Sequence, residues 1–203
     1  MVSDTQHWNN IFANKTDQDL GWYEADLSQT MKYIEQVPLT PESVIFLPGA
    51  GTSFLVDKLI SAGSHLIAND ISNKALTKLA QRVDNERLTC LCQSISDQFS
   101  SPLSVDLWID RAVLHFLLSE QEISGYFNNL LKAVKVGGYV LLAEFSHTGA
   151  KKCAGLAVHQ YSIAEMQERL GEDFELIASE EHTFINPFQQ EKPYVYGFFK
   201  RIY

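Results

Sequence analysis

Residues 43–70 carry the pattern that most constrains how this chain can fold. The apolar run at residues 43–47 predicts a strand that is buried on both of its faces. Pro-Gly-Ala-Gly at residues 48–51 predicts a tight turn into a helix, and a second apolar run follows at residues 65–68. This second strand closes with the carboxylate of Asp70. A strand, a tight loop, a helix and a second strand together predict a βαβ unit with parallel strands.

The spacing between the glycines and this carboxylate indicates a ligand. Asp70 lies 19 residues after Gly51, counted as 70 minus 51. Nucleotide-binding βαβ units place an acid on the ribose hydroxyls about 20 residues after their glycines. Because neighbouring parallel strands end at the same edge of a sheet, the loop backbone at Gly49 and Gly51 faces the same ligand as Asp70. We therefore expect these three residues to bind a nucleoside-type cofactor.

The residues of the loop narrow the choice of cofactor. A dinucleotide-binding loop needs Gly or Ala at its sixth position, and that position is Phe54 when the count starts at Gly49. No Gly-Lys-Ser/Thr follows, which excludes a P-loop. S-adenosylmethionine has a ribose and an amino acid but no phosphate, so it needs close backbone approach without a phosphate cradle. The alternative is an ordinary α/β turn in which glycine only supplies the required dihedral angles.

Composition limits the class of protein and its partners. A chain of 203 residues predicts one domain, residues 1–203, that buries a full core. The 16 basic and 25 acidic residues give a net charge of -9, which disfavours nucleic acid as a partner. No apolar stretch approaches ~18 residues and no signal-peptide pattern is present, so we expect a cytoplasmic protein that does not bind membranes. We expect no metal site, because Cys90, Cys92 and Cys153 are too few for zinc.

Strands and helices alternate along the rest of the chain. Further strands are predicted at residues 88–92, 105–110, 139–145, 174–183 and 194–200. Helices are predicted after the caps at Ser53 or Thr52, Ser72, Ser119 and Ser162, with Gly137-Gly138 ending the third of them. This alternation predicts an α/β fold, with a mostly parallel sheet and helices on both faces. The last two strands have no helix between them, so we expect an antiparallel pair at one edge.

Four of these segments resemble landmarks of a known family. In order along the chain, residues 47–53, 70–72, 106–111 and 137–140 are similar to successive motifs of class I S-adenosylmethionine-dependent methyltransferases. The resemblance covers residues 43–199. It implies a Rossmann-like seven-stranded sheet whose last strand is antiparallel, and S-adenosylmethionine as the cofactor. In that case residues 43–203 form the core and residues 1–40 form an N-terminal helical cap.

A narrower resemblance indicates the methyl acceptor. Residues 46–48, residues 108–112, Trp8 and residues 21–23 resemble features of the thiopurine and thiol methyltransferases. The resemblance implies a small-molecule acceptor with a thiol or another soft nucleophile, and a monomer or homodimer. Two alternatives stay open. One is a protein-lysine methyltransferase, for which an acidic surface would suit a basic target. The other is a nucleoside-binding regulator without catalysis.

The chain departs from the family at two cofactor positions. Most members begin the glycine motif with an acid that helps hold the amino acid part of the cofactor, and here this residue is Leu47. The acid near the adenine aligns with Ser94, with Asp97 as the alternative. Together, the spacing and the resemblance predict the following cofactor-binding residues: Trp22, Gly49, Gly51, Asp70, Ile71, Ser94, Ile95 and Asp110.

Aromatic residues and an arginine are the candidates for contacting the methyl acceptor. Trp8, Trp22 and Tyr23 precede the first strand, and their rings either face the sulfonium cation or form the core of the cap itself. Arg111 follows Asp110 at the predicted carboxyl end of a strand, where open α/β sheets bind ligands. Its guanidinium can bind an anionic substrate or keep a thiolate ionised. It can equally form an ion pair with a neighbouring aspartate.

The remaining candidates follow the fourth and fifth predicted strands. His115 is either a general base or a core histidine. Lys151 and Cys153 lie in a glycine-containing loop at the ligand edge, as do His147 and Lys152, while Tyr161 and His182 are weaker candidates for the same pocket. The predicted catalytic residues are therefore Arg111 and His115. The predicted substrate-binding residues are Trp8, Tyr23, Arg111, Lys151 and Cys153.

Overall fold

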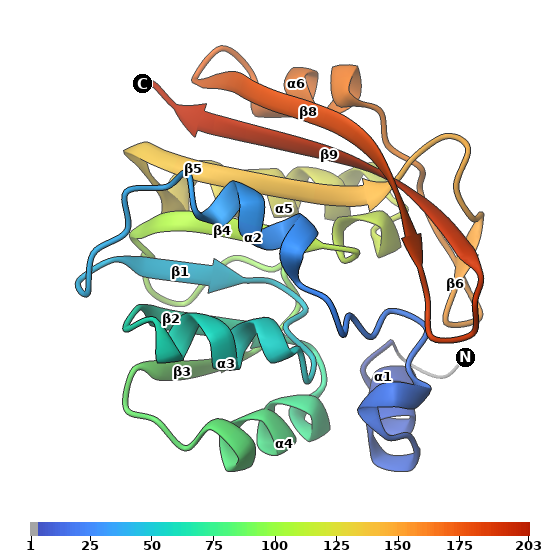
Figure 1. Cartoon of the computed structure of the whole chain (residues 1–203). Helices are drawn as coiled ribbons and strands as arrows, with labels where there is room; N and C mark the ends of the chain where they lie inside the picture. Colours follow the sequence, from blue (N-terminus) through green and yellow to red (C-terminus); the bar gives the residue numbers. More distant parts are fainter. Residues whose placement is uncertain (1–3) are drawn as a thin grey trace.

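The computed structural model describes residues 4–203 and contains one large twisted sheet (Figure 1). Its strand order is β3-β2-β1-β4-β5-β9-β8. The strands are β1 (Val44–Leu47), β2 (His65–Asp70), β3 (Leu88–Cys92), β4 (Val105–Arg111), β5 (Val134–Phe145), β8 (Phe174–Ile185) and β9 (Glu191–Arg201). A separate short hairpin consists of β6 (Lys152–Cys153) and β7 (Leu156–Ala157).

The first five strands of the sheet are parallel, and the last strand runs against them. β1 pairs in parallel with β2 and β4, β2 with β3, and β4 with β5. β9 is antiparallel to both β5 and β8. The predicted fold class is confirmed, since the sheet is mostly parallel with its last strand antiparallel. The carboxyl ends of β1, β2, β3 and β4 consequently meet at one edge.

Helices cover both faces of the sheet (Figure 1). One face packs against α2 (Ser28–Ile34), α3 (Phe54–Ser61) and α4 (Asn73–Val83), and the other against α5 (Glu120–Ala133) and α6 (Ile163–Leu170). β1 shows how the sequence produces two cores. Ile45 and Leu47 belong to the first core, and Phe46 between them belongs to the second. Successive side chains point to opposite faces of a strand, so an unbroken apolar run fills both.

Most helices begin at the predicted caps. The hydroxyls of Ser53, Ser72, Ser119 and Ser162 each accept a hydrogen bond from a backbone N–H in the first turn of the following helix. Ser119 and Glu122 form the predicted capping box in full. No helix among residues 4–203 has both the length and the apolar character needed to span a bilayer.

One expectation about a chain segment needs correction. The glycines at residues 137–138 do not end a helix, because α5 stops at Ala133 and both lie inside β5. There the register moves from Val105↔Val134 to Leu107↔Tyr139, so the strand loops out. A Cβ on Gly138 would lie 2.9 Å from the Lys135 carbonyl oxygen, so this loop needs glycine.

The N-terminal segment divides into two parts. α1 (Asp4–Asn14) lies beside α4, whereas α2 packs on the sheet (Figure 1). Tyr33 of α2 is buried and stacks on the ring of Tyr196 in β9 at 5.9 Å. The apolar face of α2 is therefore part of the main core. Only the segment around α1 and the chain that follows it stands at the ligand edge.

Candidate active site

A cavity of about 300 Å³ lies at the carboxyl ends of the parallel strands, beneath α1. It brings together segments that are far apart in the sequence. The predicted site residues that line it are Trp8, Trp22, Gly49, Asp70, Ile71, Ser94, Ile95, Arg111 and Cys153. Phe12, Phe116 and Leu156 also line this cavity, although the sequence patterns did not single them out.

Asp70 is held at the end of β2 by two backbone groups. The Gly51 N–H donates to its Oδ2 at 2.9 Å, and the Ser72 N–H donates to its Oδ1 at 2.8 Å. Burial raises the pKa of Asp70 to about 6, and the two backbone hydrogen bonds oppose this shift. Each carboxylate oxygen keeps a further lone pair, so the group can accept bonds from two adjacent hydroxyls. This arrangement fits a ribose.

The two glycines of the loop have different physical roles. Both take a positive φ, 52° at Gly49 and 53° at Gly51. A Cβ on Gly49 would lie 2.2 Å from a methyl carbon of Val113, so the loop needs glycine to pack against the chain after β4. Gly51 does not line the cavity; a Cβ there would lie 3.1 Å from the ring of Phe12. Its contribution is indirect, through its hydrogen bond to Asp70.

Four rings meet on one side of the cavity and are called the aromatic cluster here: Trp8, Phe12, Trp22 and Phe116. The ring of Trp8 lies 5.5 Å from that of Trp22 and 5.0 Å from that of Phe116, both edge to face. Trp8 and Phe12 are four residues apart on α1, so they share one face of that helix. All four rings line the large cavity. They can present faces to a cation as well as forming the core of the cap, so both expected roles are compatible.

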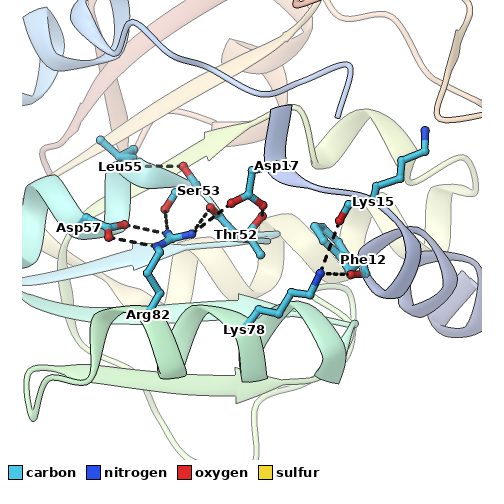
Figure 2. Close-up of polar contacts among 9 residues, drawn as sticks. All are labelled: Phe12, Lys15, Asp17, Thr52, Ser53, Leu55, Asp57, Lys78 and Arg82. Carbon is cyan, nitrogen blue, oxygen red and sulfur yellow. Dashed lines mark hydrogen bonds and ion pairs between the residues drawn. The ribbon is translucent and has the colours of Figure 1, made fainter. Parts of the chain in front are cut away.

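Polar contacts fix the N-terminal segment over the glycine loop (Figure 2). The Thr52 hydroxyl donates to the Asp17 carboxylate at 2.5 Å, and Arg82 of α4 lies 3.6 Å from the same carboxylate. The Arg82 guanidinium also donates to the carbonyl oxygens of Thr52 and Ser53. Lys78 donates to the Phe12 carbonyl oxygen at 2.5 Å. Because α4 contacts both the cap and the loop, the cap is positioned relative to the site.

Arg111 is oriented by the N-terminal segment rather than by a neighbouring aspartate. Its Nε lies 3.3 Å from Glu24 Oε1, and its Nη1 donates to the Trp22 carbonyl oxygen at 3.2 Å. The guanidinium also lies over the rings of Phe184 and Tyr194, at 4.6 and 5.3 Å. The alternative role of Arg111, an ion pair with Asp110 or Asp106, is absent from the interactions of residues 4–203. Glu24 therefore offsets much of the positive charge that Arg111 brings to the cavity.

Asp110 lies beneath the site and does not line the cavity. Its carboxylate accepts hydrogen bonds from the Val113 and Leu114 backbone N–H groups and from the Tyr126 hydroxyl at 2.7 Å. It thereby fixes the chain that follows β4. This residue is fully buried, so its predicted cofactor role can only be exerted through that chain.

His115 is a core histidine. It is fully buried, stacks on Phe145 at 4.7 Å, and does not line the cavity. Burial lowers its pKa to about 3, so the ring is neutral at physiological pH. Its Nδ1 lies 2.8 Å from Glu144 Oε2. A general base must reach the proton it removes, and this ring does not reach the cavity.

The other predicted residues are distributed around the site. Tyr23 lines a second, smaller cavity and contacts the ring of Phe54 at 6.0 Å. Lys151 is exposed and lines neither cavity. Cys153 reaches the large cavity because the β6–β7 hairpin folds over it, and burial raises the pKa of its thiol to about 11. A reactive thiolate at Cys153 is therefore disfavoured at neutral pH.

The buried carboxyl groups of Asp110 and Glu144 should make stability depend on pH. Burial raises the pKa of Glu144 to about 8, and burial together with Glu144 raises that of Asp110 well above its usual value. In the unfolded chain both carboxyl groups lose their protons near pH ~4, so above that pH the folded protein holds more protons. These groups therefore reduce the free energy of unfolding as the pH rises toward about 8.

We expect Glu144→Gln to flatten this dependence. Its free energy of unfolding should rise relative to wild type between about pH 5 and about pH 8, which denaturant titrations at several pH values can measure. Glu175→Gln, which changes an exposed carboxylate on β8, is the matched control. Parallel curves for wild type and Glu144→Gln would show that Glu144 does not carry the excess proton.

Comparison with known proteins agrees with this geometry. Residues 47–142 match the family model described as a methyltransferase domain. No curated protein sequence matches the chain significantly. A structure from echinomycin biosynthesis is 13% identical with a TM-score of 0.75, covering 98% of this chain and 92% of that one. The chain has the fold of class I S-adenosylmethionine-dependent methyltransferases.

Two further solved structures support this assignment of the fold. A methyltransferase from Anabaena variabilis is 14% identical with a TM-score of 0.75, covering 97% of this chain and 93% of that chain. The N-methyltransferase NodS from Bradyrhizobium japonicum, solved with S-adenosylhomocysteine, is 15% identical with a TM-score of 0.70 and 97% coverage of both chains. The methyltransferase domain, the Asp70 carboxylate and the cavity together indicate S-adenosylmethionine as the cofactor.

Proposed function

We propose that this protein is a methyltransferase that transfers the methyl group of S-adenosylmethionine to a small-molecule nucleophile, with a thiol or a related soft nucleophile as the acceptor class. One observation carries the proposal. A single cavity contains the Asp70 carboxylate, which two backbone N–H groups hold in place, and the aromatic cluster of the cap. A nucleoside and a cation are the two chemical features that S-adenosylmethionine combines.

The residues of the cavity supply binding and alignment. When bound, S-adenosylmethionine provides an electrophilic methyl group on a sulfonium. Asp70 can hold the ribose, and a face of the aromatic cluster can stabilise a desolvated cation by ~0.5–2 kcal/mol. The cap covers one side of the cavity with the rings of Trp8 and Phe12. Rate enhancement then comes mainly from holding two reactants in line.

The lining of the cavity supports a small acceptor without negative charge, because the carboxylates of Asp4, Asp70 and Glu122 line it beside Arg111. A volume of about 300 Å³ lies at the low end for small-molecule sites. Arg111 is the only basic side chain among the described lining residues, and Glu24 offsets its charge. The structure from echinomycin biosynthesis concerns the conversion of a disulfide bond into a thioacetal group. This sulfur chemistry on a similar fold supports a sulfur atom as the methyl acceptor.

The test is a methyl-transfer assay with three distinguishable outcomes. Purified protein is incubated with methyl-labelled S-adenosylmethionine and, separately, a panel of small thiols, a panel of small amines, and a cell lysate. We expect label in the products of small neutral thiols, and much less label with Asp70→Ala when the cofactor concentration does not saturate the variant. Label in a protein band would favour the protein-lysine alternative. Tight cofactor binding without transfer to any acceptor would favour a non-catalytic regulator.

A further inference from the structure

Arg111 and Glu24 lie where two neighbouring cavities meet. A second cavity of about 80 Å³ shares Trp22, Gly49 and Arg111 with the large one. Glu24 lines only this smaller cavity, together with Leu47. The smaller cavity therefore adjoins the glycine loop and offers a cation and an anion at its wall.

The guanidinium of Arg111 has unused hydrogen-bonding capacity. Its Nη1 donates to the Trp22 carbonyl oxygen, whereas Nη2 is buried and reaches no well-aligned acceptor among residues 4–203. The Tyr196 hydroxyl is a polar neighbour of the guanidinium, but it is not aligned to accept a full hydrogen bond from it. Nε is close to Glu24 at 3.3 Å without a hydrogen-bonding alignment. Leaving a buried donor unpaired is unfavourable, and more so when the donor belongs to a charged group. Such a donor at a cavity wall is a place where an anionic ligand group can bind.

Glu24 offers a largely buried carboxylate beside the guanidinium of Arg111. Its side chain is only 11% exposed, and burial raises its pKa while Arg111 opposes the shift. The residues that the structure describes donate no hydrogen bond to its carboxylate apart from the close approach of Arg111. The carboxylate can therefore accept bonds from a cationic ligand group. The two side chains place one anion-binding and one cation-binding group within a few ångströms.

We propose that Glu24 and Arg111 form the subsite for the amino acid end of the cofactor, with Glu24 accepting from its ammonium group and Arg111 donating to its carboxylate. This inference rests on the proposed function and identifies residues for a part of the cofactor that Asp70 does not contact. An α-amino acid is a zwitterion, and its two charges complement this pair. The side chain at position 47 is a leucine, so the glycine motif itself offers no charge to the cavity.

A simpler role for the pair is to hold the N-terminal segment against β4. The two roles predict different dependence on the structure of the ligand. If the pair only anchors the N-terminal segment, its loss should change the affinity for every ligand by the same factor, because the pair then only keeps the cavity formed. A zwitterion subsite affects only ligands that carry the amine or the carboxylate.

Four ligands separate these roles in titration calorimetry. S-adenosylhomocysteine carries both groups, and 5′-methylthioadenosine carries neither. 5′-S-(3-aminopropyl)-5′-thioadenosine carries only the amine, and 5′-S-(3-carboxypropyl)-5′-thioadenosine only the carboxylate. We expect wild type to bind S-adenosylhomocysteine roughly 10- to 100-fold more tightly than 5′-methylthioadenosine. This comparison needs no variant, so it tests the proposal even if a substitution prevents folding.

The variants then assign each charge to one side chain. Glu24→Gln should weaken the amine-bearing ligands by roughly tenfold or more and leave the carboxylate-only ligand unchanged. Arg111→Gln should weaken the carboxylate-bearing ligands and leave the amine-only ligand unchanged. Neither variant should change the affinity for 5′-methylthioadenosine. Because each single change unpairs a buried charge, the double variant is measured as well.

Glu180→Gln is the matched control. Glu180 of β8 pairs with Lys32 of α2, so it also joins the N-terminal segment to the sheet, but it lines neither cavity. Its substitution should leave all four affinities unchanged.

Two results would overturn the subsite while leaving the proposed function intact. One is equal affinity of wild type for S-adenosylhomocysteine and 5′-methylthioadenosine. The other is a loss in Glu24→Gln that is the same for all four ligands. Failure of wild type to bind any of the four would contradict the proposed function itself.

Discussion

Asp70→Ala is expected to weaken the binding of S-adenosylmethionine by roughly 1.5–3 kcal/mol, or about one to two orders of magnitude in affinity. The carboxylate is fixed by the backbone N–H groups of Gly51 and Ser72 and faces the cavity. Without it, two ribose hydroxyls would lose charge-assisted acceptors in a buried part of the site. Titration calorimetry on the folded variant measures the loss.

The same variant should also bind 5′-methylthioadenosine more weakly, because that ligand keeps the ribose. Asp70→Ala thus differs from the Glu24 and Arg111 variants, which should spare this ligand. Asp106→Ala removes the partner of Lys135 and of the Val44 backbone N–H outside both cavities, so it is the control for a general loss of stability. An unchanged affinity in a folded Asp70→Ala protein would remove the central support for the cofactor site.

Trp108→Ala is expected to lower the free energy of unfolding by about 3–5 kcal/mol. Trp108 of β4 is fully buried and stacks on Phe46 of β1 at 4.3 Å. Its Nε1 donates to the Tyr126 hydroxyl at 2.9 Å, and that hydroxyl in turn donates to Asp110. The substitution therefore leaves a large cavity and also removes one member of a buried hydrogen-bond chain.

Denaturant titration measures this loss of stability. Two further variants separate the effect of lost volume from that of the lost hydrogen bond and provide an exposed control. Trp108→Phe keeps most of the volume but loses the indole N–H, so its loss should be smaller than that of alanine. Tyr203→Ala changes an aromatic side chain that is 73% exposed and should alter stability by no more than about 0.5 kcal/mol. A loss below about 1 kcal/mol in Trp108→Ala would mean that the core repacks around the missing ring.

The prediction of the βαβ unit succeeded because its signals are local. The apolar run of β1, the serine caps and the positive-φ glycines each act within a few residues of the chain. The interval to Asp70 depends only on the length of one helix and two strands. The identity of the partner that orients Arg111 is not local, because Glu24 is 87 residues away in the sequence, counted as 111 minus 24.

His115 illustrates why side-chain direction after a strand could not be predicted. Ala112 takes a φ of 70°, which is uncommon for a residue with a Cβ, and it turns the chain directly after Arg111. Beyond that turn Phe116 lines the cavity, whereas His115 packs beneath it against Phe145. A histidine near the carboxyl end of a strand is compatible with either direction, so the pattern left both open.

The sequence by itself determined the order of strands and helices, the glycine loop, and the carboxylate that faces it, since these follow from periodicity, caps and spacing. Only the tertiary structure decided which side chains share the cavity. α1 brings Trp8 and Phe12 to the ligand edge, and the β6–β7 hairpin brings Cys153 there. The physical reason is that these contacts depend on how separate segments pack together, and the short-range pattern of residues does not encode that packing.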